Sequence, residues 1–274
     1  MSALLTIKNL TVSTDKKTIL RKLSVVIKPG EMHVLMGPNG SGKSTLAYAL
    51  LGHPHYTVTA SELSFAGKNL KTLTTDERAR LGLFLGFQYP LAISGLSLSH
   101  FLPAALQTRL RQKKSVSKQA YVMLADKMAA EQRVAAEKFR SAVGENLQKL
   151  GLKEEMLYRS LNEGFSGGEK KKAEILQMLA LHPKLAILDE PDSGLDVDAL
   201  KKIAAAINAA HKHGTAILLI THYQRILKYL KPDKVHVLAN GKLVKSGGPE
   251  LARVIERKGY EQLVSKKKIR KSSP

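Results

Sequence analysis

A glycine-rich segment with one lysine carries the clearest chemical signal in the chain. Residues 37–45 read Gly-Pro-Asn-Gly-Ser-Gly-Lys-Ser-Thr and match the pattern G-x-x-x-x-G-K-S/T. Glycines let successive backbone N–H groups converge on phosphate oxygens, and a helix that starts at the loop adds partial positive charge. Lys43 would reach the β- and γ-phosphates, and Ser44 would offer its hydroxyl to Mg²⁺. The expected nucleotide-binding residues are Gly37, Pro38, Asn39, Gly40, Ser41, Gly42, Lys43, Ser44 and Thr45.

Two neighbouring acids form the second candidate site. Residues 185–190 read Leu-Ala-Ile-Leu-Asp-Glu, an apolar strand that ends in two carboxylates. If that end faces the phosphate loop, Asp189 would hold the Mg²⁺ shell and Glu190 would orient or deprotonate the attacking water. A strand that simply leaves the core can end in the same way, so this interpretation depends on the phosphate loop.

A third segment combines a serine and two glycines. Residues 165–169 read Phe-Ser-Gly-Gly-Glu and precede a charged helical stretch. The N–H groups at such a helix start can bind an anion. The same residues also form an ordinary helix N-cap, and the segment alone does not separate the two readings.

The pattern of apolar residues predicts the elements that position these groups. A helix is expected over 44–51, after the phosphate loop. Residues from about 101 to 150 have helical spacing, as in Leu124 and Met128. Strands that alternate with helices around a phosphate loop predict an α/β fold with a mostly parallel sheet and helices on both faces. The predicted strands are 4–7, 23–27, 32–36, 62–65, 185–188, 215–220 and 235–238, the last followed by an Asn240-Gly241 type I′ turn into 242–245.

Together these motifs resemble the ATP-binding cassette (ABC) ATPases. They occur in the order of that family: 37–45, Gln88, 166–168, 189–190, 193–196 and His222. The resemblance implies a P-loop, RecA-like α/β core, an antiparallel β subdomain and a helical signature subdomain. It implies one ABC ATPase domain over 1–274, with the core and β subdomain at about 1–88 and 180–250, the helical subdomain at about 89–179, and a basic disordered tail at about 265–274.

The same resemblance assigns catalytic and metal-binding roles. It implies that Glu190, His222 and Gln88 are catalytic, with Gln88 sensing Mg²⁺ and the attacking water and His222 contacting the γ-phosphate. The residues expected around Mg²⁺ are Ser44, Gln88 and Asp189.

The resemblance also implies a second copy of the chain. Ser166, Gly167 and Gly168 would bind the ATP held by the phosphate loop of the partner, and Asp196 would lie in the loop that crosses to it. The chain has one phosphate loop and one Ser-Gly-Gly signature, so two copies would be needed to complete the ATP sites.

A finer resemblance covers about residues 4–263. Residues 162–178 read NEGFSGGEKKKAEILQM and are similar to the SufC-type ATPases of the Suf iron–sulfur cluster assembly system. This implies Mg²⁺-dependent hydrolysis of ATP to ADP and phosphate, with SufB and SufD homologues as partners. ATP-driven closure of the ATPase pair would remodel the SufB–SufD scaffold on which clusters form. Further similar segments are 87–90, 192–201, 221–225 and 258–261.

Some positions depart from these families. Lys172 and Ala173 replace the usual Arg and Asn, and Pro191 is more typical of transporters. Residues 12–17 read Val-Ser-Thr-Asp-Lys-Lys, without the aromatic residue that stacks on adenine in many ABC ATPases. We therefore expect weaker recognition of the base.

The uncharged stretch after Gln88 lies where the family docks its partners. We expect Tyr89, Pro90, Ile93 and Leu96 to line a partner-binding groove. The alternative is that these side chains are buried in the core of the helical subdomain.

Composition bounds what else the chain could do. Its 274 residues contain 44 Lys+Arg against 23 Asp+Glu, a net charge of +21, with basic clusters within 109–118 and 266–271. Such a balance raises nucleic acid, an anionic membrane or an acidic partner as contacts, and a solvated basic surface is the alternative. There is no cysteine, so the chain could power cluster assembly but could not hold a cluster by thiolate.

Two other function classes compete with the Suf ATPase. One is the nucleotide-binding subunit of an ABC importer, which would pair with a membrane permease. The other is a nucleic-acid-linked cassette ATPase, but Gln88 and Ser166 are only 78 positions apart, too few for the long coiled-coil arm of DNA-repair members. We see no signal peptide and no stretch suited to span a membrane, and expect a cytoplasmic protein.

Overall fold

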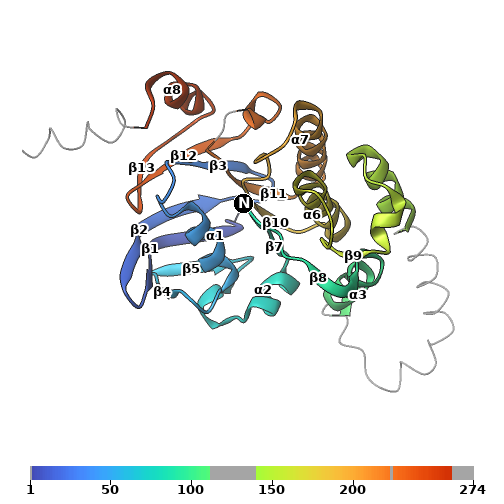
Figure 1. Ribbon diagram of the computed structural model, residues 1–274. Helices are drawn as coiled ribbons and strands as arrows, with labels where there is room; N and C mark the ends of the chain where they lie inside the picture. Colours follow the sequence, from blue (N-terminus) through green and yellow to red (C-terminus); the bar gives the residue numbers. More distant parts are fainter. Residues whose placement is uncertain (1, 112–139, 223–224, 261–274) are drawn as a thin grey trace, which may run out of the picture. The chain divides into compact units, whose positions relative to one another are not determined.

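The computed structural model describes residues 2–111, 140–222 and 225–260 (Figure 1). The expected helical pair Leu124/Met128 and the expected tail at 265–274 lie outside these residues. Contacts divide the chain into two units. The first comprises Met1–Gln88, Pro183–Ser193 and Ile207–Pro274, and the second comprises Tyr89–His182 and Gly194–Ala206.

Six strands of the first unit form a mostly parallel sheet in the order β13-β12-β3-β11-β10-β7. Strand β13 is antiparallel to β12, and the other neighbours are parallel. Strands β3, β10 and β11 are buried at every residue, as expected for parallel strands covered on both faces. The bounds are β3 Met32–Met36, β7 Leu83–Gly86, β10 Leu185–Asp189, β11 Ala216–Ile220, β12 Lys234–Ala239 and β13 Lys242–Gly247.

Four of the parallel strands lead directly into the residues with candidate chemistry. Strand β3 runs into the phosphate loop and β7 into Gln88, while β10 ends at Asp189 beside Glu190, and β11 is followed by Thr221 and His222. The carboxyl ends of parallel strands meet at one edge of a sheet, which is where open α/β sheets bind ligands. The sheet therefore gathers these side chains at one edge.

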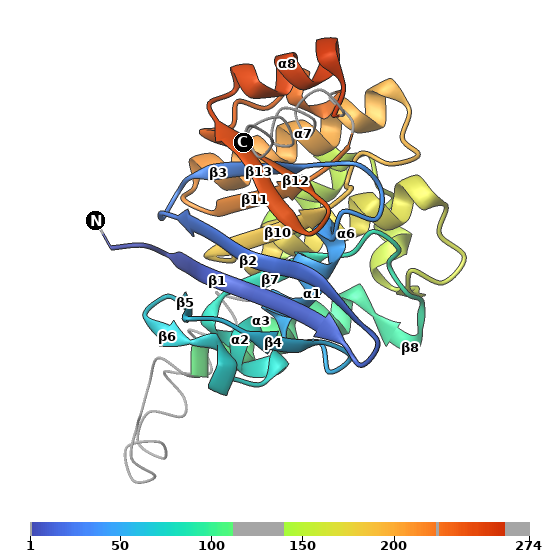
Figure 2. The same cartoon turned by 90° about the vertical axis from the view of Figure 1, so that its left-hand side faces the viewer.

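The first unit also contains an antiparallel sheet, ordered β2-β1-β5-β6 with β4 paired to β1 (Figure 2). One apolar core includes side chains from both sheets and from helix α1, such as Phe65, Leu46 and Leu218. Full burial of one such side chain contributes about 1.5–3 kcal/mol. The bounds are β1 Leu5–Thr14, β2 Lys17–Ile27, β4 Thr57–Thr59, β5 Glu62–Phe65 and β6 Lys68–Asn69.

Helix α1 (Lys43–Leu51) begins at the phosphate loop, and Arg78 of helix α2 (Thr75–Leu81) holds its other end. The last carbonyl groups of a helix lack partners within the helix. The Arg78 guanidinium is buried and donates to four carbonyl oxygens, two of them in the last turn of α1. These acceptors are Ala49, Leu50, Leu70 and Leu73. The remaining helical segments of this unit are the 3-10 turns Leu70–Thr72 and Ile226–Lys228 and helix α8 Glu250–Lys258.

The described part of the second unit is mainly helical. It contains a short two-stranded sheet, β8 (Ile93–Ser97) with β9 (Ser160–Leu161). Residues 140–150 are also helical. Among the described residues, no helix is both long enough and apolar enough to span a membrane. The other helices are α3 Leu98–Arg111, the 3-10 turn Glu154–Leu157, α6 Gly167–Leu181 and α7 Val197–Lys212, which contributes residues to both units.

The α/β fold expected from the sequence is confirmed. The predicted strands 32–36 and 62–65 have the expected bounds. Asn240 and Gly241 have φ of 49° and 72°, the left-handed pair that a type I′ turn requires. Strand β7 was not predicted, because its four residues lie within a longer uncharged stretch.

Two buried histidines link neighbouring strands of the parallel sheet. His236 Nε2 on β12 lies 3.1 Å from His33 Nδ1 on β3, His33 Nε2 lies 3.1 Å from a Glu31 oxygen, and His236 Nδ1 lies 2.8 Å from the Ser246 hydroxyl. Burial lowers the pKa of both rings, and with the nearby His33 and Lys234 it lowers the pKa of His236 to about 4. Both rings are therefore neutral at pH 7.

We expect this pair to make the fold sensitive to acid. In the unfolded chain His236 would titrate near 6.5, against about 4 in the fold, so the unfolded state binds more protons between these values and stability falls as pH is lowered through that window. The unfolding free energy, measured by urea denaturation, should fall by on the order of 2 kcal/mol between about pH 7 and pH 5. The variant His236→Gln should lose less over the same range. Equal losses in both proteins would contradict the assignment.

Candidate functional site

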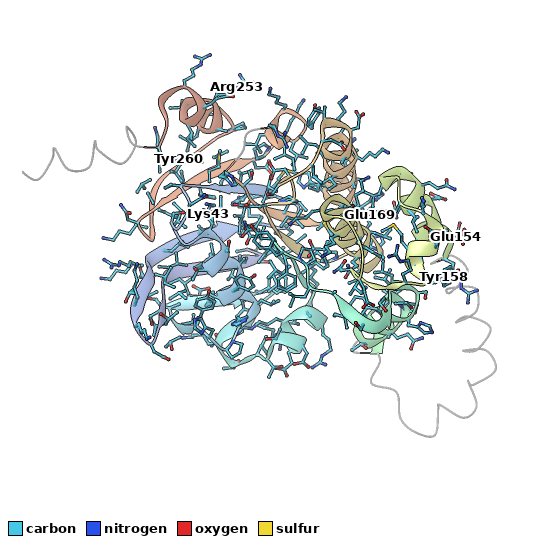
Figure 3. All side chains as sticks on the ribbon, viewed as in Figure 1. Lys43, Glu154, Tyr158, Glu169, Arg253 and Tyr260 are labelled. Atoms are coloured by element: carbon cyan, nitrogen blue, oxygen red, sulfur yellow. The ribbon has the colours of Figure 1, made fainter. Side chains whose placement is uncertain are left out.

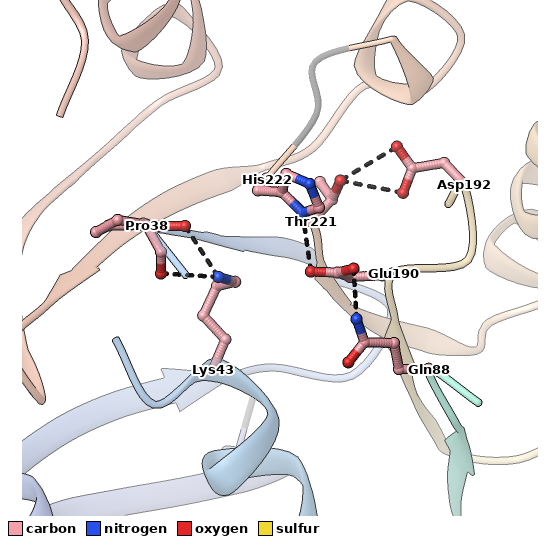
Figure 4. Close-up of polar contacts among 8 residues, drawn as sticks. Pro38, Lys43, Gln88, Glu190, Asp192, Thr221 and His222 are labelled. Carbon is pink, nitrogen blue, oxygen red and sulfur yellow. Dashed lines mark hydrogen bonds and ion pairs between the residues drawn. The ribbon is translucent and has the colours of Figure 1, made fainter. Parts of the chain in front are cut away.

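The phosphate loop has the backbone that its glycines predict. Gly40 and Gly42 have φ of 73° and 103°, values that L-residues with a side chain rarely adopt. Lys43 folds back over the loop, and its Nζ donates to the carbonyl oxygens of Gly37 at 2.9 Å and Pro38 at 3.1 Å (Figure 4). Two carbonyl groups at the start of the loop thus hold the ammonium group.

The loop residues fit a bound phosphate. The Ser41 hydroxyl oxygen is buried and has no hydrogen-bond partner within the described structure, and a buried polar group of this kind calls for a ligand or water. Burial lowers the pKa of Lys43, and the carboxylates of Glu190 and Asp189 oppose that shift. A cation held away from water beside two acids is suited to bind the charged oxygens of a nucleotide.

Glu190 is held between two of the predicted catalytic side chains. Gln88 Nε2 donates to one carboxylate oxygen at 2.8 Å, and His222 Nδ1 lies 2.8 Å from the other (Figure 4). Gln88 follows β7 and His222 follows β11, the two strands that flank β10 in the sheet. The strand order therefore brings all three predicted residues together.

The backbone of Glu190 is strained. Its φ is 50°, in the left-handed region that costs a residue with a side chain on the order of 1–3 kcal/mol. The Glu190 N–H nevertheless donates to the Ile220 carbonyl at 2.8 Å, which anchors this backbone to β11. Strain of this kind persists only where the surrounding structure enforces it, and it is frequent at active sites.

A buried acid beyond Glu190 was not predicted to have a role. Asp192 is fully buried, and the Thr221 hydroxyl lies 3.1 and 3.2 Å from its two oxygens. Burial raises the pKa of Asp192, and the contact with Thr221 opposes the shift. The pair ties the segment after β10 to the segment after β11. The sequence pattern did not predict this Asp192–Thr221 pair, because both residues lie outside the predicted apolar strands.

The residues expected around Mg²⁺ lie at the same edge of the sheet. Asp189 is the buried last residue of β10, and Ser44 is half-buried in the first turn of α1. Carboxylate, amide and hydroxyl oxygens are the ligands that Mg²⁺ prefers. These residue types therefore fit the metal.

The signature residues belong to the second unit, whereas the other predicted site residues belong to the first. Ser166 is the N-cap of α6, and its Oγ accepts from the Glu169 N–H at 3.3 Å while Glu169 accepts from the Ser166 N–H at 2.8 Å. Hydrogen bonds from Ser166 lower the pKa of Glu169, which is labelled in Figure 3. Gly167 and Gly168 form the first turn. The segment is thus a capped helix start, which also presents N–H groups where an anion could bind.

Comparison with known proteins decides the family. The sequence profile of the ABC transporter family matches residues 20–193. The chain belongs to the ABC transporter family. A relative from Bacillus subtilis (strain 168), "Vegetative protein 296", is 46% identical over 257 residues, 94% of this chain and 92% of that protein. The "Probable ATP-dependent transporter ycf16" of Cyanophora paradoxa is 46% identical over 268 residues, 98% of this chain and 97% of that protein.

Solved ABC cassettes share the fold. An ATP-binding subunit of an ABC transporter matches with a TM-score of 0.73 at 24% identity, covering 96% of this chain and 98% of that one. A dimeric bacterial ABC transporter cassette matches with a TM-score of 0.68 at 21% identity, covering 89% and 98%. With the family assigned, this ABC chain is an ATP-binding subunit and an ATPase.

We expect two substitutions in this ABC ATPase to separate binding from hydrolysis. Glu190→Gln keeps the size of the side chain but removes the carboxylate that we expect to act as the base, so kcat should fall by at least about 100-fold while ATP still binds. Lys43→Ala removes the buried cation, so the Kd for ATP should rise by at least about tenfold. Fluorescent-nucleotide titration and phosphate release measure the two effects. Near-normal turnover in Glu190→Gln would show that Glu190 is not the base.

Proposed function

We propose that the chain is the ATP-hydrolysing subunit of a Suf-type iron–sulfur cluster assembly complex. It dimerises on ATP binding and drives a conformational change in a scaffold of SufB and SufD homologues. The observation that carries the ATPase part is the Glu190 carboxylate, held by Gln88 and His222 beside the Lys43 loop. The Suf assignment is supported by residues 162–178, with their Phe-Ser-Gly-Gly-Glu-Lys-Lys segment.

The geometry supports general-base catalysis by Glu190. The two hydrogen bonds at 2.8 Å fix the carboxylate plane, so that it can orient a water and accept its proton as that water attacks the γ-phosphate. Lys43 leaves the loop carbonyls to bind the β- and γ-phosphates. Mg²⁺, when bound, neutralises charge that develops on the phosphate oxygens, and Ser44, Gln88 and Asp189 would hold it.

Each ATP site needs two copies of the chain. The phosphate loop and Glu190 come from one copy, and Ser166, Gly167 and Gly168 at the start of α6 come from the other. Ser166 and Gly167 are exposed residues, which leaves this helix start accessible to a second subunit. In this arrangement Asp196, whose side chain accepts from the Ala199 N–H at 2.7 Å, lies at the boundary between the copies.

An exposed apolar surface in the second unit supports a protein partner. Tyr89, Leu91 and Ile93 are 78%, 81% and 46% exposed, so the alternative that Tyr89 and Ile93 are buried in the core of the helical unit is wrong. Pro90 and Leu96 are half-buried. Large apolar side chains gathered at one surface mark interaction sites. We assign this surface to the scaffold, which also supplies the thiolates that the chain lacks.

Affinity purification of the full-length protein from its source tests the assignment. We expect SufB and SufD homologues to co-purify with the wild-type chain. Recovery of a multi-span permease in their place would support the importer alternative and overturn the proposal.

Ile93→Glu tests the docking surface. A buried charge at the interface is costly, so this variant should lose the scaffold proteins while its Kd for ATP stays within about twofold of wild type. Val26→Glu on β2 is the matched control, because Val26 is similarly exposed at 42% but lies on the antiparallel sheet. It should retain both partners. Full recovery of the scaffold by Ile93→Glu would contradict the assigned surface.

A further inference from the structure

The phosphate loop contacts the hairpin formed by β12 and β13. The Gly241 N–H donates to the Ser41 carbonyl at 3.2 Å. A Cβ on Gly37 would lie 2.1 Å from the Leu238 carbonyl oxygen, so the backbone of β12 packs directly against the first glycine of the loop. The hairpin therefore touches the loop at two points.

The same turn is fixed on its other side by strand β2. The Arg21 N–H donates to the Gly241 carbonyl at 2.8 Å, and a Cβ on Gly241 would lie 2.0 Å from the Ile19 carbonyl oxygen. Figure 2 shows β13 beside β2, in agreement with the contacts between the two strands. Because Gly241 is packed between Ile19 and Ser41, the turn cannot shift without displacing the loop or β2.

A third contact comes from the chain beyond α8. Gly259, with φ of 67°, ends α8 with its N–H bonded to the Ile255 carbonyl at 2.8 Å. The next residue, Tyr260, has a buried hydroxyl that interacts with the Gly37 backbone without completing a hydrogen bond. Burial raises the pKa of this hydroxyl, and the Gly37 backbone opposes the shift. Tyr260 thus adds a polar interaction at the first glycine of the loop.

We propose that Leu238, Gly241 and Tyr260 form a brace that holds the phosphate loop in its binding geometry, and that Gly241 and Tyr260 are positioning residues for nucleotide binding. A glycine-rich loop has many conformations available to it. A loop that is already fixed binds with a smaller entropic cost. The brace supplies this rigidity from elements outside the loop itself. The proposal rests on nucleotide binding at the loop, as proposed above.

The test compares Gly241→Ala with Gly67→Ala in the full-length chain. Both glycines follow a residue with φ of 49° in a hairpin turn and have φ of 72° and 76°, so both substitutions carry similar backbone strain. Only Gly241 has atoms against its Cβ position, whereas Gly67 has none within 4 Å. Tyr260→Phe removes only the hydroxyl, and Tyr229→Phe, at a tyrosine that is 38% exposed, is its control.

The readouts are the Kd for a fluorescent ATP analogue, the KM and kcat for ATP, and the melting temperature. We expect Gly241→Ala to raise the Kd by at least about tenfold and Tyr260→Phe by at least about threefold, with kcat unchanged. Both controls should bind as wild type does. If Gly241→Ala fails to fold, the Kd of Tyr260→Phe alone tests the proposal.

Two results would overturn the brace. One is a Kd within twofold of wild type in both Tyr260→Phe and folded Gly241→Ala. The other is an equal rise in Kd in Gly67→Ala. Absence of ATP binding by the wild-type chain would instead refute the proposed function, so the two failures are distinguishable.

Discussion

The position of the Glu190 carboxylate depends on hydrogen bonds from both sides of its strand. Gln88 follows β7 and His222 follows β11, and these strands flank β10 in the parallel sheet. A different strand order would leave the carboxylate with one partner or none. The positive φ of Glu190, which turns the chain out of β10 at this point, persists because the Glu190 N–H is bonded to Ile220.

The charges around this carboxylate are arranged so that burial can be tolerated. Lys43 is buried, which lowers its pKa, and the carboxylates of Glu190 and Asp189 oppose this shift. Asp192 is buried as well, and the Thr221 hydroxyl bonds both of its oxygens. Buried charges are stable only when they are paired and hydrogen-bonded. Glu190 and Asp189 therefore stabilise the charged form of Lys43, whereas the Thr221 hydroxyl stabilises the charged form of Asp192.

Much of the site at the carboxyl edge of the parallel sheet could be predicted from the sequence, because local sequence patterns determine its conformation. The phosphate loop combines glycines at positive φ with a following helix, and Asn240-Gly241 has the composition of a type I′ turn. Asp192–Thr221 and the contact between Gly241 and Ser41 could not be predicted, because each joins residues that are far apart in sequence and depends on strand order. The same holds for β7, whose burial comes from its neighbour β10 rather than from its own four residues.

The net charge of +21 comes mainly from basic residues that are not among the predicted site residues. Several of the basic residues fall within 112–118 and 266–271, outside the described structure. The proposed function depends on a few side chains at one edge of the sheet, and the lack of cysteine fits the proposal that this subunit supplies energy while its partners hold the cluster.

A double-mutant cycle on ATP hydrolysis tests most directly whether His222 acts through Glu190. His222→Ala, Glu190→Gln and the double variant would be compared by single-turnover phosphate release at saturating ATP. If His222 works by orienting Glu190, the double variant should be only slightly slower than Glu190→Gln. Its rate should then be much higher than the rate expected if the two single-variant losses were multiplied. Losses that multiply in full would show that the two residues act independently and would contradict the account.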